Sequence, residues 1–431
     1  MAFFWFPWTL VLMAAPTPAP GADGAHPDAK TVATLAGRAV GGDAQALGEL
    51  RAMGPEGLDL LLQVRSELSS VPPFPSDDPR ARAWDGMIDR VARQQHATAS
   101  GLYWYTDLAQ AKARAAKEGK AIVSLRLLGA LDEVLSCANS RFFRTLLYPD
   151  PAVRAALHDR FILHWESVRQ APKITIDFGD GKVLTRTVTG NSMHYLLDAK
   201  GRVVDALPGV VGPAAFVAWL DEVDGFARKS VALADPAFVS ARARVHTAWR
   251  TSTLARWRVA LKDIGIVVGG GEDELAAATT EDVIARLGEA RPGALRMDPT
   301  AQSMLERLYA DRGEPPMGPD RTRTDRPTAE RAAPLAVSKM AVERPMLPWL
   351  RNLRGKVAQD EVQNDFVLHT RIRGMLAASE EVDPSAFTAP IYASVFLTPL
   401  DDPYMGLAAP DVFSAIPPDV EKPVAAARDD R

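Results

Sequence analysis

Leucines recur at helical spacing in the N-terminal part of the chain, as expected for helices with one buried face. Gly54 and Pro55 interrupt the pattern, because glycine favours the end of one helix and proline the first turn of the next. Two helices are therefore predicted, over residues 43–53 and 56–68, within a helical segment 26–100. Their shared apolar seam would contain Leu47, Leu50, Leu58, Leu61, Leu62 and Leu68.

After residue 101 short apolar runs alternate with amphipathic stretches. Asp107 is a residue type that caps helix N-termini, and Gly119 one that ends helices. Continuous apolar runs of about five residues are typical of buried strands. The predicted elements are a helix over 107–117, a strand over 121–125, helical stretches over 142–147 and 151–158, and a strand over 161–165.

Two hairpins and a closing helix are predicted next. Gly179-Asp180-Gly181 separates the β-rich runs 174–176 and 183–188, which is a strong turn signal. A second pair of runs, 193–197 and 203–207, is split by the turn sequence Asp198-Ala199-Lys200-Gly201. An amphipathic helix over 216–226 closes the unit. The order is thus helix, strand, helix, strand, hairpin, hairpin, helix.

The rest of the chain is predicted to be mainly helical. Residues 231–311 have helical periodicity, with Trp249, Trp257 and Leu261 as core candidates. The stretch 312–340 is rich in proline and arginine and is typical of a linker. The remaining predicted parts are a helical region 341–416, with its clearest helix over 357–376, and a loose tail 417–431.

The first 25 residues contain an uncharged apolar run over 2–15, followed by a stretch rich in proline, alanine and glycine. The run is shorter than the roughly 20 residues that span a bilayer, but it suits the core of a signal peptide. No basic residue precedes the run, so a lipid-contacting anchor and a mis-assigned start remain alternatives. We expect a periplasmic or other extracytoplasmic bacterial protein that contacts the membrane only through this leader, if it is uncleaved.

The charge and the cysteine count exclude several classes of function. With 50 basic and 54 acidic residues the formal net charge is -4, which gives no global electrostatic basis for binding nucleic acid. Cys137 is the only cysteine, so an intrachain disulfide and a four-cysteine zinc site are both excluded. A single thiol in an exported protein is either buried and inert or kept for its reactivity.

Three segments resemble the thioredoxin-like family. They are Glu118-Gly119-Lys120-Ala121-Ile122 before a core strand, Cys137 placed 16 residues before the Val153 of Asp150-Pro151-Ala152-Val153, and the run Ser192 to Asp198 with Gly201. The resemblance implies an α/β fold: a thioredoxin-like central domain, residues 101–230, flanked by mainly α-helical N- and C-terminal regions. Ser140 stands where the family has its second cysteine, and Ser192 where it has a cis-proline.

A second likeness covers blocks that partly overlap these segments. Residues 136–150, 175–195 and 396–407 resemble an uncharacterised bacterial group. This likeness names relatives but implies no activity.

The chemistry expected at Cys137 follows from its place at the start of a helix, where unpaired N–H groups and the helix dipole favour the thiolate. Without a resolving cysteine, only a monothiol cycle is left, in which Cys137 attacks a disulfide or peroxide and an outside thiol resolves the product. The partner would be a protein thiol or disulfide, or a small thiol, with no cofactor.

Ser140 is expected to donate a hydrogen bond to the sulfur. By the resemblance, the binding residues around the thiol are Asn139, Asn191, Ser192 and His194.

Two other interpretations stay open. Cys137 would be an inert core residue if the domain is a redox-inactive module that binds another protein through its flanking helices.

Glu361, Asp365 and His369 follow one another at i, i+4 and i+8, so one helix face offers three ligand-type side chains. The same face also fits a core stripe, and we predict no metal site.

Overall fold

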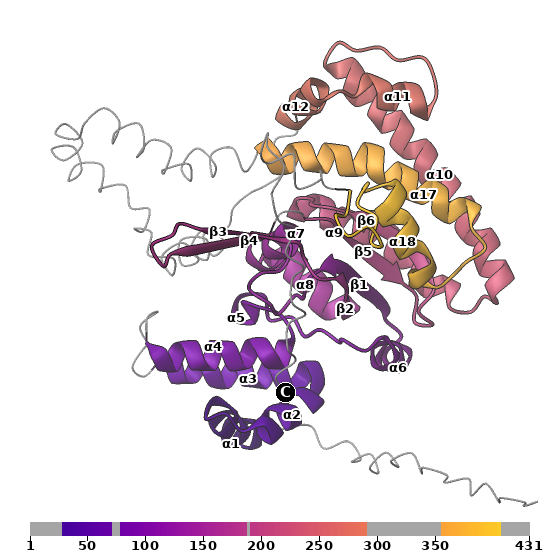
Figure 1. Cartoon of the computed structure of the whole chain (residues 1–431). Helices are drawn as coiled ribbons and strands as arrows, with labels where there is room; N and C mark the ends of the chain where they lie inside the picture. The colour runs from indigo at the N-terminus through magenta and orange to yellow at the C-terminus, as the bar shows by residue number, and fades with distance from the viewer. Residues whose placement is uncertain (1–27, 71–77, 188–189, 291–354, 407–431) are drawn as a thin grey trace, which may run out of the picture.

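The computed structural model describes residues 28–70, 78–187, 190–290 and 355–406 (Figure 1). The predicted leader 1–25, the linker 312–340 and the tail 417–431 lie outside these residues. The described chain is mixed α/β, with helical regions on both sides of a central sheet.

The N-terminal helices have a hydrophobic core of their own. They are α1 (Ala29–Val40), α2 (Ala44–Ala52), α3 (Gly54–Ser70), α4 (Pro79–Ala92) and the short α5 (Ala97–Ser100). Asp43 caps α2 by accepting from the N–H groups of Gln45 and Ala46. The two predicted helices are confirmed, and Leu50, Leu58 and Leu61 are fully buried between them. Leu68 is 40% exposed, so the predicted seam ends before it.

The central sheet has the strand order β2-β1-β5-β6. Its strands are β1 (Ala121–Leu128), β2 (Phe161–Arg169), β5 (Ser192–Leu197) and β6 (Val203–Pro208). β1 runs parallel to β2, whereas the β1–β5 and β5–β6 pairs are antiparallel. Every residue of β1, β5 and β6 is buried, as the continuous apolar runs predict.

Helices precede, connect and follow these strands. They are α6 (Leu108–Glu118), α7 (Ala138–Phe142), the π-helical η1 (Phe143–Leu147), α8 (Pro151–Arg160) and α9 (Pro213–Ser230). Asp107 caps α6, and Gly119 ends it in the left-handed conformation at φ 66°, as predicted. The predicted helical stretch 142–147 is present, but most of it is a π-helix.

The predicted hairpin around Gly179-Asp180-Gly181 is confirmed as a separate two-stranded sheet of β3 (Lys173–Asp177) and β4 (Val183–Thr187). Both glycines have φ near 80°, which this turn requires. Figure 1 shows the hairpin extending away from the central sheet.

The C-terminal half packs on the free edge of β6 and on the helices beside it. Its helices are α10 (Asp235–Asp263), α11 (Glu272–Ala278), α12 (Glu281–Glu289), the π-helical η2 (Gln363–Leu368), α17 (His369–Ala378) and α18 (Pro384–Ser394). Arg242 and His246 of α10 donate to the carbonyls of Val203 and Val204, and the Val203 N–H donates to the carbonyl of Val382. The edge strand is thereby covered. The long helix predicted over 357–376 is present and contains the π-helical segment η2.

A half-exposed ionic contact links the N-terminal helices to the central region. His158 of α8 lies 3.3 Å from Asp59 of α3 and 2.8 Å from the neighbouring Asp159. The hydrogen bond to Asp59 is the main reason why the pKa of His158 rises to about 9. A raised pKa means that the contact stabilises the fold fully below about pH 6.5 and loses this contribution as the pH rises through about 9.

We therefore expect the free energy of unfolding to fall between pH 7 and 9.5 more in the wild type than in Asp59→Asn. Because His158 is 40% exposed, the difference should not exceed about 1 kcal/mol. Urea unfolding at a series of pH values measures it, with Asp85→Asn on the neighbouring α4 as the control. An identical pH dependence for the wild type and Asp59→Asn would contradict the assignment.

Candidate functional site

Cys137 lies where the sequence places it, at the N-terminal end of a helical segment. It caps α7, and its Sγ accepts a hydrogen bond of 3.4 Å from the backbone N–H of Ser140. The Cys137 N–H in turn donates to the carbonyl of Leu128 at the end of β1. Cys137 therefore lies at the end of the sheet where the parallel strands β1 and β2 have their C-termini.

Ser140 does not use its hydroxyl as predicted. The hydroxyl lies 2.6 Å from Oγ of Ser136 and 2.9 Å from the carbonyl of Cys137. These contacts satisfy the hydroxyl, since a helical serine readily bonds a carbonyl one turn before it. The backbone of Ser140, and not its side chain, contacts the sulfur.

Asn139 and Ser192 meet across 53 positions of sequence, because Asn139 Nδ2 donates to Ser192 Oγ at 3.0 Å. Gly190 allows the approach, since a Cβ at that position would lie 2.7 Å from Oδ1 of Asn139. The structure thus brings Cys137, Asn139 and Ser192 to one end of the sheet.

His194 is a core residue. Its Nε2 bonds the hydroxyl of Tyr148 at 2.8 Å, and its ring packs edge-on against Phe143 and Phe216. Burial lowers the pKa of His194 to about 3, so the ring is neutral. Burial, and after it the charge of a Cys137 thiolate, raise the pKa of Tyr148 well above its usual value. His194 shapes the core under the site and does not line an accessible surface.

A C-terminal segment covers the thiol end of the sheet. Asn191 donates to Oγ1 of Thr398 at 2.8 Å, and its carbonyl accepts from the hydroxyl of Tyr392. Arg169, at the end of β2, donates to the carbonyls of Leu400 and Asp402. Cys137 is 0% exposed. No local pattern in residues 391–402 indicates this contact, so sequence reasoning missed it.

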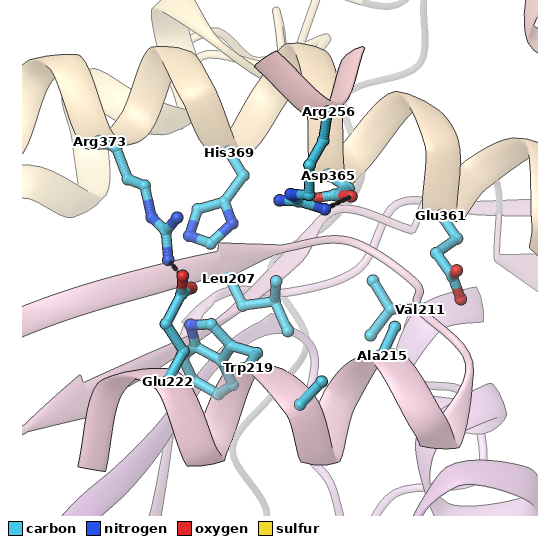
Figure 2. A pocket seen from close by; sticks show the side chains of 11 residues that line it. Leu207, Val211, Ala215, Trp219, Glu222, Arg256, Glu361, Asp365, His369 and Arg373 are labelled. Atoms are coloured by element: carbon cyan, nitrogen blue, oxygen red, sulfur yellow. Dashed lines mark hydrogen bonds and ion pairs between the residues drawn. The ribbon is translucent and has the colours of Figure 1, made fainter. Parts of the chain in front are cut away.

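A second candidate site is a pocket of about 240 Å³ between α9, α10 and the η2–α17 helix (Figure 2). Glu361, Asp365 and His369 line it together, so the single helix face predicted for them is confirmed. Trp219 and Glu222 contribute from α9 and Arg256 from α10.

Asp205, a buried residue of β6, is the centre of the polar network beside this pocket. Its carboxylate accepts from Trp219 Nε1 at 3.1 Å, from His369 Nε2 at 3.0 Å and from Arg373 Nη2 at 2.9 Å. Burial alone would raise the pKa of Asp205, but Arg373 and His369 hold it well below its usual value. The network therefore contains a carboxylate that stays ionised inside the protein.

The remaining carboxylates of the pocket are also engaged. Glu361 accepts from the N–H of Gly212, the N-cap of α9, at 2.9 Å. Asp365 pairs with Arg256 at 3.1 Å. Among the described residues, no group of three or more histidine, cysteine, aspartate or glutamate side chains is arranged to hold a metal ion. These two contacts join the C-terminal helix to the start of α9 and to α10.

Comparison with known proteins adds no relative: no family model, curated protein or solved structure matches this chain. Within the described ranges, no helix is both long and apolar enough to cross a membrane.

Proposed function

We propose that residues 101–230 form a thioredoxin-like domain without redox activity, and that the chain binds another protein in the cell envelope. The order of elements supports the fold: a parallel β1–β2 pair joined by helices, the antiparallel β5–β6 pair, and then α9. This is the order that the sequence resemblance implies. The envelope location rests on the apolar leader, and the flanking helical regions supply the binding surface.

The burial of Cys137 carries the proposal. A thiol that reacts with a protein disulfide or a peroxide must reach it, but Cys137 is 0% exposed. Tyr148 and Tyr392 are both buried, and burial first and Cys137 second raise the pKa of each. The C-terminal contacts at Asn191 and Arg169 lie at the end of the sheet where the resemblance places the residues around the thiol.

A monothiol cycle is the second candidate, and the hydrogen bond from the Ser140 N–H to Sγ favours it. Residues 391–402 would first have to move. The Cys137 thiolate would then attack a disulfide and release one thiolate, and an outside thiol would attack the mixed disulfide. That second step restores Cys137 and leaves a disulfide between the outside thiol and the bound half of the substrate.

Alkylation of Cys137 by iodoacetamide distinguishes the two functions. For the binding module, we expect native labelling to be roughly 100-fold or more slower than labelling in denaturant, since the thiol reacts only when the structure opens. A native rate that saturates with pH, with a midpoint below about 8, would contradict the proposal and favour the monothiol cycle. Cys137→Ser is the blank.

The binding half of the proposal has its own test. Cells carrying Cys137→Ala in place of the wild type should yield the same cross-linked partner, in the same amount, because the thiol takes no part. Loss of that partner in Cys137→Ala, but not in a Ser136→Ala control, would contradict the proposal.

A further inference from the structure

The β3–β4 hairpin exposes an unusual amount of apolar surface. All five residues of β3 are exposed, and Ile174, Ile176 and Phe178 are 40%, 45% and 62% exposed. Because side chains alternate along a strand, these three share one face of the hairpin. Leu184, paired with Ile176, joins them. A two-stranded hairpin is marginally stable by itself and gains from a further strand.

The two edges of the hairpin differ. Thr187, at the end of β4, is tied to the domain: its Oγ1 accepts from Arg141 at 3.0 Å and lies 3.3 Å from the carbonyl of Ser136, next to Cys137. Within the described ranges, no backbone hydrogen bond joins β3 to anything except β4. Among the residues that the structure describes, the outer edge of β3 thus has no strand beside it, and such an edge can pair with another strand.

We propose that β3 pairs with β3 of a second copy of this chain, which gives a continuous four-stranded sheet across a two-fold axis. The sequence Lys173-Ile174-Thr175-Ile176-Asp177 is self-complementary about Thr175, because the isoleucines are placed symmetrically and the two ends carry opposite charges. Antiparallel pairing about this residue places each Lys173 opposite Asp177 of the other copy, and each Ile174 opposite the other Ile176. Opposite charges and matched β-branched side chains are the pairs that stabilise neighbouring strands.

The same pairing also gives the exposed isoleucines apolar neighbours across the new edge. The isoleucines of both copies lie side by side on one surface of the joined sheet, next to Phe178 and Leu184. The β4 edge lacks this symmetry, because pairing about Thr185 would set Arg186 against Leu184 and Val183 against Thr187. Charge and side-chain pairing therefore favour β3, and not β4, as the strand that pairs with a second copy.

Sedimentation velocity of the full chain over a concentration series tests the proposal. We expect the wild type to form a dimer. Lys173→Asp should associate about tenfold or more weakly, because the new aspartate of each copy then lies opposite Asp177 of the other. Mixing Lys173→Asp with Asp177→Lys should restore association, since the mixed pair again has opposite charges. Asp177→Lys also loses the acceptor for the Gly179 N–H, so Asp177→Asn, which keeps an acceptor, is measured beside it.

Ile176→Lys should abolish the dimer, whereas Val267→Lys should leave it intact. Val267 is 84% exposed and belongs to the segment between α10 and α11, so it controls for the loss of an exposed apolar side chain elsewhere. A wild type that stays monomeric at high concentration would overturn the proposal. Unchanged association of Lys173→Asp and Ile176→Lys would do the same, because the dimer would then form through another surface.

Discussion

Replacing Arg373 by methionine is expected to lower the free energy of unfolding by about 3–5 kcal/mol, because it removes one partner of a buried ion pair. Asp205 is 0% and Arg373 2% exposed, so the substitution leaves a buried carboxylate without its guanidinium partner. Methionine keeps much of the side-chain volume, and the effect therefore reports on charge more than on packing. Chemical denaturation of the full chain near neutral pH measures it.

Arg256→Met is the matched control, since Arg256 lines the same pocket and also pairs with a carboxylate, Asp365. Its side chain is 53% exposed, so the loss should stay below about 1 kcal/mol. Equal losses in the two variants would show that burial does not set the strength of these pairs.

Arg373→Met should also change the acid stability. A carboxyl group whose pKa is depressed in the folded state stabilises the fold above its unfolded value and loses that contribution as the pH falls. Without Arg373 the pKa of Asp205 rises, so acid unfolding should begin at a higher pH than in the wild type.

The sequence predicts the elements of this fold because their signals are local. Asp107 and Gly119 bracket α6, and Gly179-Asp180-Gly181 forms the turn of a hairpin, each through its own backbone preferences. The shared face of Glu361 and His369 is likewise a matter of helical spacing.

The partners of these residues are not local and could not be predicted. Asp205 stands between apolar residues in β6, and its two main partners are 164 and 168 positions away. A single sequence contains no signal for such a pairing. The cover over Cys137 was missed for the same reason, because Asn191 and Thr398 are 207 positions apart.

Gly209 lies between Asn364 of η2 and Ser192 of β5. Gly209→Ala should destabilise the fold by about 2–4 kcal/mol. Its φ of 66° is unfavourable for alanine, and an added Cβ would lie 2.5 Å from Nδ2 of Asn364. Asn364 cannot move freely, because it is 6% exposed and donates to the carbonyl of Val210 at 2.7 Å. The variant must therefore push η2 away from the sheet or break that hydrogen bond.

Gly119→Ala separates the two causes. Gly119 has the same φ of 66°, but a Cβ there meets nothing within 4 Å, so only the backbone strain of about 1 kcal/mol remains.

Gly209 also donates its N–H to the carbonyl of Ser192, beside the thiol end of the sheet. If docking of the C-terminal helix keeps that end closed, native alkylation of Cys137 should be faster in Gly209→Ala than in Gly119→Ala. Equal labelling rates would mean that residues 391–402 stay in place without η2, and that the cover depends on their own contacts with Asn191 and Arg169.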